Sequence, residues 1–420
     1  MSAAAFHASV QLLRTRRFGT FWFASLLSNI GTWAQQLARP WLLLSLGASP
    51  FLLGVDAFAL AAPVFLLTLV GGALADASDR RRTILKFQSL QMLCPIAIVL
   101  LLWFHAAQPW MVIVLSLVVG ITDGLSMPSF QSIVPSIVDK KQIPTGIALN
   151  STQFNLSRIL GPAIAGVLMG SVGAVGAFGV SALSYVPFIL VALWVLPRGV
   201  DVAATQPNTS GLVWVRMLAN VREILLQPVL RGALTTVFIS GLLCAPLVVF
   251  CPVLVQQAMH GDVGHFSLAV GAFGVGGLLG AISLLGLDAQ RNRRPITSAF
   301  AWVYGLVVMV ASQATSVWGL TLLFACAGFA MTMSNTSANT LLQSASSTVM
   351  RGQTVSLFML VMRGGMALGG LITGLSIVLL GVREALLLNG ILAVLLQSTV
   401  AFYWWRGEHF RLQRPHPPKH

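Results

Sequence analysis

The chain has 420 residues, of which 56% are hydrophobic and only 9% are charged. Soluble proteins carry roughly 25% charged residues, so this composition excludes a water-exposed globular body. The formal charge of +14 is spread over short gaps between long apolar segments rather than gathered in one patch. We therefore expect the basic residues to contact membrane lipids and not nucleic acid.

Long apolar segments repeat along the whole chain. A membrane-spanning helix needs roughly 20 apolar residues. The sequence therefore predicts an all-α membrane protein with twelve transmembrane helices, at about residues 18–46, 50–74, 83–104, 109–137, 143–170, 174–196, 228–257, 264–288, 295–313, 316–343, 352–380 and 384–405.

The basic residues alternate between the two sides of the predicted membrane. Of the 25 Lys and Arg residues, 21 fall in the tails, in every second gap or in the first turn of the helix that follows such a gap, whereas the opposite gaps hold only Arg383. Because basic loops resist translocation, this asymmetry predicts that both termini are cytoplasmic.

The longest gap lies at the middle of the chain. Residues 197–227 read as a cytoplasmic linker that includes an amphipathic helix, and they separate two six-helix bundles, 1–196 and 228–420. Weak similarity between the halves supports pseudo-symmetry, because the glycine and basic residues near position 72 are echoed near position 280. Such repeats, with a site between them at the midplane, are typical of transporters.

A short motif stands between the second and third predicted helices. It comprises Gly72 and Asp76, followed by Asp79, Arg80 and Arg81. The motif resembles the cytoplasmic signature of the major facilitator superfamily, and the helix count and central linker extend that resemblance over the whole chain. It implies that Asp76 contacts the start of the eleventh helix and closes the cytoplasmic side. Asp79 and the arginines can instead serve only as a solvated anchor of topology.

Further segments are similar to the bacterial exporter branch that includes enterobactin exporters, among them Phe21-Trp22 and Gly31-Thr32-Trp33. This resemblance implies a multi-pass protein of the bacterial inner membrane. One departure is Ala77, which stands where the family motif usually has a basic residue.

The fifth predicted helix contains Gly161, Pro162 and Gly166. This pattern resembles the antiporter signature of the same superfamily and implies antiport, in which a substrate is exchanged for an ion. A simpler interpretation is tight packing, because small residues allow close helix approach and proline bends the axis.

Five ionisable residues lie well inside predicted spans: Arg39, Asp56, Asp123, Arg158 and Arg363. A charge in the membrane costs a few kcal/mol or more, so it normally faces a partner or a cavity. Helix rise places Arg39 and Asp56 at matched depth in one hairpin, and Asp123 and Arg158 at matched depth in another. We therefore predict an Arg39–Asp56 pair and an Asp123–Arg158 pair.

These charges suggest roles in transport. Asp123 is the leading candidate for the proton-coupling site and Asp56 the second, although both pairs can be purely structural. Arg363 has no acidic partner in its own half, so we expect it to meet Asp123 across a cavity or to attract an anionic substrate. The net charge of the five residues, +1, favours anionic or zwitterionic substrates.

Polar side chains on two helices complete the predicted cavity. The first helix contributes Trp33 and Gln35, and the tenth contributes Asn335 and Asn339. Unpaired amides are costly in hydrocarbon, so these faces are expected to line water or a ligand.

We interpret the chain as a monomeric secondary transporter that exports a small organic molecule, siderophore-like or drug-like, by proton antiport with alternating access. An importer, a lipid flippase or a non-transporting sensor or scaffold remain alternatives. We expect no enzyme activity, cofactor or metal, because the sequence contains neither a nucleophile–base constellation nor a metal-ligand cluster.

Overall fold

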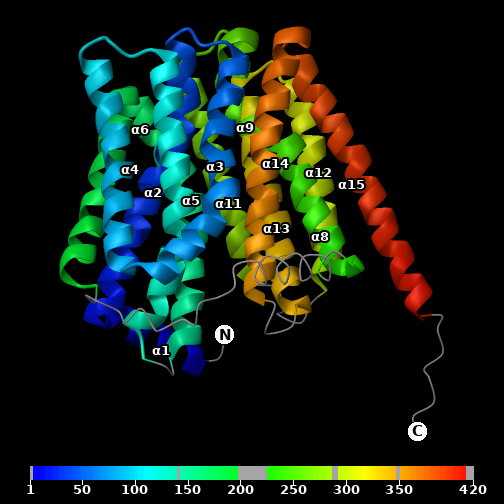
Figure 1. Cartoon of the computed structure of the whole chain (residues 1–420). Coiled ribbons are helices and arrows are strands. Elements are labelled where there is room, and N and C mark those ends of the chain that lie inside the picture. Colours follow the sequence, from blue (N-terminus) through cyan, green and yellow to red (C-terminus); the bar gives the residue numbers. More distant parts are fainter. Residues whose placement is uncertain are drawn as a thin grey trace.

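The computed structural model describes residues 3–139, 142–196, 224, 226–285, 292–346 and 351–412. In these ranges the regular elements are helices, without strands (Figure 1). Ten segments of the described helices are long and apolar enough to cross a membrane. Most of the predicted linker, 197–227, lies outside the described residues.

The first part of the chain forms six helices: α1 (Ala3–Arg14), α2 (Arg16–Ser45), α3 (Pro50–Ala77), α4 (Arg80–Trp103), α5 (Pro109–Ile137) and α6 (Ile143–Trp194). Helix α1 was not predicted. Helix α6 is two helices joined at Gly173, whose φ of 65° and ψ of −167° interrupt the helical backbone. A positive φ is easily adopted only by glycine, which explains why the helix breaks at this residue. The break falls between the two predicted segments 143–170 and 174–196.

The second part begins with a segment that is less regular than predicted. A single helix over 228–257 was expected, but the structure has α8 (Pro228–Ile239), the π-helix η2 (Ser240–Cys244), α9 (Pro246–Val249), α10 (Cys251–Val253) and the π-helix η3 (Leu254–Ala258). Pro246 and Pro252 lack the N–H that a continuous α-helix requires, which explains the interruptions. The Tyr304 hydroxyl donates to the carbonyl oxygen of Cys244 at 3.3 Å and so satisfies a backbone group beside the break.

The remaining helices are regular: α11 (Val263–Leu285), α12 (Arg293–Ser312), α13 (Val317–Ala345), α14 (Arg351–Leu380) and α15 (Val382–Leu412). Side-chain oxygens cap the starts of α4 and α12. Asp79 accepts from the backbone N–H of Arg81 at 2.9 Å at the start of α4, and Asn292 accepts from that of Arg294 at 3.0 Å at the start of α12. These caps satisfy amides that have no partner within the helix.

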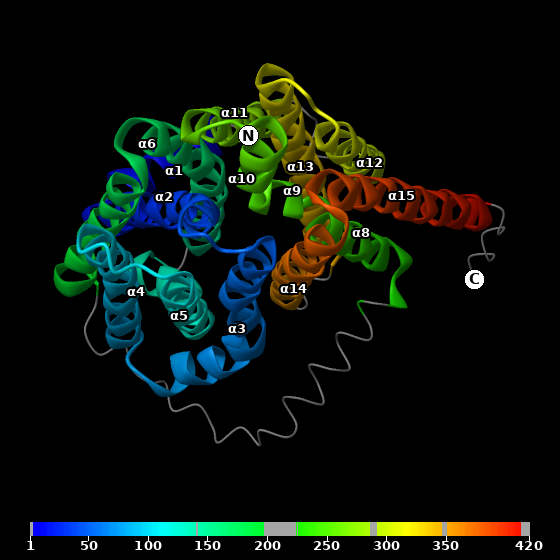
Figure 2. The ribbon, with the colours of Figure 1, turned by 90° about the horizontal axis from the view of Figure 1, so that it is seen from above.

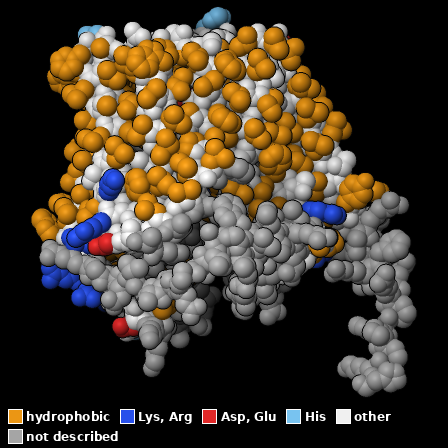
Figure 3. All heavy atoms as spheres, viewed as in Figure 1, with side chains coloured by type: hydrophobic (Ala, Val, Ile, Leu, Met, Phe, Trp, Pro, Cys, Tyr) orange, Lys and Arg blue, Asp and Glu red, His pale blue; other side chains and the backbone are white. Residues whose placement is uncertain are grey.

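The helices run roughly along one axis and gather in two groups (Figures 1 and 2). Seen from above, α3 lies beside α14 and α6 beside α11, and these are the main contacts between the groups. Helix α1 and the end of α15 lie at the same, lower end (Figure 1). Hydrophobic side chains cover the middle and upper face of the molecule, whereas Lys and Arg side chains appear toward the lower end (Figure 3). This surface fits a lipid environment.

Among the described residues, the two groups share an apolar cluster at one end only. One cluster joins residues from both groups near the upper helix ends, including Leu53, Phe250, Phe266 and Ile377. Near the lower ends there are two separate clusters, one formed by residues 12–196 and the other by residues 224–362. The two groups therefore pack together firmly at the upper end and keep separate cores below.

Glycines allow the backbones of the two groups to approach closely at the upper end. A Cβ atom on Gly54 of α3 would lie 2.5 Å from the carbonyl oxygen of Gly370 on α14. On the other side, a Cβ on Gly166 of α6 would lie 2.5 Å from the carbonyl oxygen of Ser267 on α11. Trp41 stacks on Phe266 above this contact, with ring centroids 5.1 Å apart.

We predict that Gly54→Ala lowers the melting temperature of the detergent-purified protein. The added methyl group meets backbone on α14 that cannot move aside easily, and overpacking of this kind costs about 1–3 kcal/mol. Gly179→Ala on α6 is the matched control, because nothing lies within 4 Å of a Cβ there. Alanine favours a helix over glycine by about 1 kcal/mol, so the control is expected to melt at the same temperature or slightly higher. Equal melting temperatures for the two variants would contradict the close approach.

Candidate functional site

Five residues from three helices meet near the middle of the molecule, and we call them the arginine ring. Trp33 comes from α2, Arg158 and Gly161 from α6, and Met362 and Arg363 from α14. The guanidinium carbon of Arg363 lies 5.7 Å from the centre of the Trp33 ring. The Nη1 of Arg158 donates to the sulfur of Met362 at 3.7 Å. A Cβ on Gly161 would lie 2.3 Å from the Cβ of Trp33, so these two helices touch.

The arginine ring lies far from either end of its helices. Arg158 lies midway between the start of α6 and its break at Gly173, and Trp33 and Arg363 lie in the central parts of α2 and α14. Because α2 and α6 belong to the first group of helices and α14 to the second, the ring connects the two groups at mid-depth. It brings together three of the charged or aromatic residues predicted from the sequence.

Asp123 of α5 is held by a chain of buried amides. The Nε2 of Gln91 donates to Oδ1 of Asp123 at 2.6 Å, and the Nε2 of Gln88 donates to Oε1 of Gln91 at 3.0 Å. The Ser28 hydroxyl completes the chain by donating to Oε1 of Gln88 at 3.4 Å. Gln88 and Gln91 lie three residues apart on α4, so both side chains share one face. The chain therefore connects α2, α4 and α5.

Charge interactions link Asp123 to the arginine ring. The carboxylate of Asp123 is attracted most strongly by Arg363 and more weakly by Arg39. The guanidinium groups of Arg158 and Arg363 repel each other. The predicted Asp123–Arg158 ion pair is wrong, since no nitrogen–oxygen distance between these two described residues is within 4.0 Å. The alternative expectation, that Arg363 meets Asp123 across a cavity, stays a prediction, because these two described residues form no ion pair within 4.0 Å either.

The predicted Arg39–Asp56 ion pair does not form within 4.0 Å either. Asp56 of α3 accepts a hydrogen bond from the Ser116 hydroxyl of α5 and still interacts electrostatically with Arg39. Arg39 is 2% exposed, and its Nε and Nη1 have no hydrogen-bond partner in the described part of the chain. Matched depth along two helices does not fix the direction in which a side chain points, which explains why the pair was predicted incorrectly.

The cytoplasmic motif has local structural contacts in this conformation. Asp79 caps α4, and its Oδ2 forms a salt bridge with Nε of Arg82 at 3.6 Å. Arg81 donates from Nε to the carbonyl oxygen of Ala192 at 2.7 Å and from Nη2 to that of Leu193, close to the end of α6. A basic side chain at a helix C-terminus satisfies carbonyls that have no partner in the helix.

Three further members of the motif are Gly72, Asp76 and Arg80. The side chains of Asp76 and Arg80 lie outside the described residues, so the predicted contact with the start of α14 has no structural observation here. Apart from the adjacent turns of its own helix, no described residue lies within 4 Å of a Cβ at Gly72. The gating role of these three residues stays a prediction.

The motif on the fifth predicted helix is a packing element. Gly161 lies against Trp33, and Gly166 lies against α11 in the other group of helices. The side chain of Pro162 is outside the described residues. The tight-packing interpretation is therefore supported at both glycines, while a link to antiport stays a prediction.

Three predicted cavity residues are not joined to the arginine ring by any contact that the structure shows. Gln35 is 1% exposed, and no described residue forms a hydrogen bond with its Nε2. Asn335 on α13 is likewise buried with an unpaired Oδ1, and Asn339 accepts from Gln343 at 3.1 Å. Their place in a substrate cavity stays a prediction.

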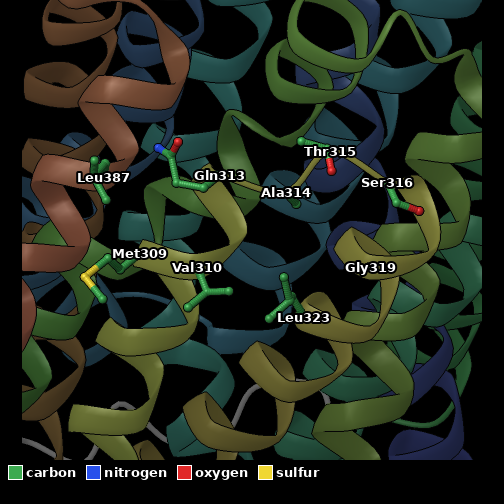
Figure 4. Close-up of a pocket in the computed structure, with 9 residues that line it drawn as sticks. All are labelled: Met309, Val310, Gln313, Ala314, Thr315, Ser316, Gly319, Leu323 and Leu387. Atoms are coloured by element: carbon green, nitrogen blue, oxygen red, sulfur yellow. The ribbon is translucent and has the colours of Figure 1, made fainter.

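Two hollows lie on the second group of helices, away from these residues. One, of about 500 Å³, lies between α12, α13 and α15 and is lined by Met309, Gln313 and Leu323 among others (Figure 4). Another, of about 600 Å³, lies between the lower parts of α12 and α15. Neither contains a residue of the arginine ring or a charge predicted to be functional, so we define the candidate site by its side-chain contacts.

Several residues of the site were not singled out from the sequence, namely Gln88, Gln91, Ser116 and Met362. Gln88 and Gln91 carried a usable signal, because two amides three residues apart in an apolar helix share a face and need partners. Ser116 and Met362 gave none. In the described part of the chain, no group of three His, Cys, Asp or Glu side chains is placed to hold a metal ion.

A family model for "transmembrane secretion effector" proteins matches residues 7–412. The staphyloferrin A transporter of Staphylococcus aureus is 26% identical over 269 residues, which are 63% of this chain and 66% of that protein. The match thus spans just under two thirds of that relative. The multidrug efflux pump Tap of Mycolicibacterium fortuitum is 24% identical over 314 residues, 73% of this chain and 76% of the pump.

Solved structures show the same fold. The nucleoside transporter NupG superposes with a TM-score of 0.69 at 15% identity, covering 93% of this chain and 99% of that one. A bacterial homologue of the human lysosomal transporter Spinster, in an inward-facing and unoccupied conformation, gives 0.66 at 16% identity, covering 97% and 99%. At these identities the likeness concerns the fold alone.

We predict that Gln91 and Asp123 stabilise the protein jointly. Gln91→Leu removes the donor to a carboxylate, and losing a hydrogen bond to a charged group costs about 1.5–3 kcal/mol. Asp123→Leu and the double variant complete a double-mutant cycle, measured by unfolding of the purified protein in detergent. The double variant is expected to be destabilised by less than the sum of the single variants. Additive losses would show that the 2.6 Å contact contributes nothing.

Proposed function

Because the chain belongs to the transmembrane secretion effector family of the major facilitator superfamily, we propose that it is a secondary active transporter that exports a small organic molecule in exchange for protons. The family and the relatives named above are transporters, not enzymes. The chain is a multi-pass protein of the bacterial inner membrane. A staphyloferrin A transporter and a multidrug pump among the relatives support a siderophore-like or drug-like substrate.

The observation that carries the proposal is the arginine ring. It joins both groups of helices at mid-depth through Trp33, Arg158 and Arg363, and its charges lie in the central part of membrane-length helices. Charges inside a membrane protein normally mark a substrate or ion pathway. A site at the junction of two groups can be exposed to either side when the groups move relative to each other.

We propose twelve crossings, counting α2 and the two parts of α6, with the lower end in the cytoplasm. The alternation of basic residues and the position of Lys and Arg toward the lower end support this orientation (Figure 3). The shared upper core and the separate lower cores then correspond to a conformation closed to the outside. Alternating access would separate the upper ends and join the lower ends. The hydrophobic face supports a lipid-embedded monomer.

Asp123 is the proposed proton carrier, and Asp56 a secondary candidate. When ionised, Asp123 attracts Arg363 and so draws α14 toward α5. Protonation removes this attraction between the two groups of helices. The other charged group that acts on Asp123 is Arg39 of α2, and Gln91 of α4 is its hydrogen-bond donor. Proton binding at Asp123 is thereby coupled to the contact between the groups.

Everted inner-membrane vesicles, acidified inside by respiration, test this proposal. A compound that is exported in exchange for protons enters such vesicles and dissipates the pH gradient, which a fluorescent pH indicator reports. We expect at least one compound from a panel of siderophores and amphoteric dyes to dissipate the gradient with the wild-type protein. Asp123→Asn is expected to abolish that response because the side chain no longer binds a proton.

Asp139→Asn serves as the matched control, since Asp139 is an exposed aspartate just past the end of α5. It is expected to behave like the wild type. A full response in Asp123→Asn would reject Asp123 as the carrier. An importer, a flippase or a sensor would leave the gradient intact for every compound that this chain binds.

A further inference from the structure

The arginine ring and Asp123 form an unbalanced group of charges. Two guanidinium groups, Arg158 and Arg363, repel each other, and a single carboxylate, Asp123, attracts Arg363 without a contact within 4.0 Å. The group therefore holds one more positive than negative charge when Asp123 is ionised. Since uncompensated charge is costly within the membrane, a ligand carboxylate beside the two arginines would stabilise the group.

Among the described residues, no oxygen atom accepts a hydrogen bond from either arginine. Arg158 has no hydrogen-bond partner at Nε, and its Nη1 bonds the thioether of Met362, which is a weak acceptor. The guanidinium group of Arg363 lies over the face of Trp33. Guanidinium groups form their strongest hydrogen bonds with carboxylates, often through two parallel N–H donors. The unused donors at Arg158, beside a second guanidinium group, fit a carboxylate.

Asp123 carries the opposite charge to the two arginines and can bind a cation. Its Oδ1 accepts from Gln91, and the side chain remains partly exposed. No cationic side chain of the described residues forms an ion pair with it within 4.0 Å. The carboxylate of Asp123 can therefore bind the protonated amine of a ligand. A cation at this position competes with a proton for the same carboxylate, whereas an anion alone would favour proton binding.

The walls of the site are apolar. Phe154 packs edge-on against Trp33 with centroids 6.2 Å apart, and Met362 is 5% exposed. Ligand sites commonly combine such walls with a few polar groups that fix orientation. An apolar or aromatic body attached beside the charged groups of a ligand would match these surroundings.

We propose that the site binds a zwitterion, with a carboxylate on Arg158 and Arg363, a protonated amine on Asp123 and an apolar body against Trp33 and Phe154. This rests on the proposed function, in which the arginine ring is the transport site, and it names the class of substrate. This mode of binding also explains the exchange of substrate for protons. The amine of the substrate displaces the proton of Asp123, so the substrate and the proton bind to this carboxylate in turn. A substrate with a carboxylate only would bind together with the proton and could not drive antiport.

Equilibrium binding to the full-length protein in detergent tests the proposal without any gradient. The probes are L-phenylalanine, its N-acetyl derivative, which lacks the cation, and its methyl ester, which lacks the anion. L-phenylalanine is expected to bind about tenfold or more tightly than either derivative, because each derivative loses a charge-assisted hydrogen bond. Its binding is expected to release protons from the wild type and none from Asp123→Asn.

Variants test which residues bind the carboxylate of the probe and which bind its amine. Arg363→Gln and, independently, Arg158→Gln are expected to weaken binding of L-phenylalanine and its N-acetyl derivative but not of the methyl ester. Asp123→Asn is expected to weaken binding of L-phenylalanine and the methyl ester but not of the N-acetyl derivative. Arg82→Gln, at an exposed arginine outside the site, is the control and should bind all three as the wild type does.

Equal affinity for the three probes, absence of binding of all three, or variants without this pattern would each overturn the zwitterion site. Melting curves of the variants verify that they are folded. If the binding pattern holds while vesicles show no proton exchange, the proposed antiport fails and the site stands. If vesicles show exchange while the binding pattern fails, only the ligand class is wrong.

Discussion

The cost of an ionised side chain in hydrocarbon is the constraint on which the centre of this molecule depends. Five such residues lie within helices of membrane-spanning length, and the structure brings three of them, Asp123, Arg158 and Arg363, together between two groups of helices. Amides and hydroxyls on neighbouring helices, such as Gln91 and Ser116, hydrogen-bond to the carboxylates. Polar side chains in otherwise apolar helices thus have a common physical explanation.

The limits of the helices could be predicted closely because they depend on local composition. The segment 109–137 coincides with α5, and the predicted gap after residue 170 coincides with the break at Gly173. Regularity within a helix was less predictable. One continuous helix was predicted over 228–257, although it contains Pro246 and Pro252, and the form of its interruption, two short π-helical turns, depends on contacts such as that of Tyr304.

The partners of the buried charges could not be predicted, because sequence fixes how deep a residue lies but not which neighbour its side chain faces. Arg39 and Asp56 lie at similar depth, yet Asp56 bonds Ser116. Arg158 and Arg363 lie in one site because α6 and α14 pack beside α2. This packing depends on residues far apart in the chain, so it could not be predicted from local sequence. The motif at Asp79 was recognised from its pattern, whereas the bonds of Arg81 to the end of α6 depend on tertiary structure.

The shared upper core also has a thermodynamic consequence. Any rearrangement that parts the upper ends must hydrate side chains such as Trp41 and Phe266, which now lie against each other. Hydration of apolar surface increases heat capacity, so the enthalpy of that step varies with temperature. The balance between the two conformations should therefore follow a curved rather than a straight van 't Hoff plot, and cooling should favour the hydrated arrangement.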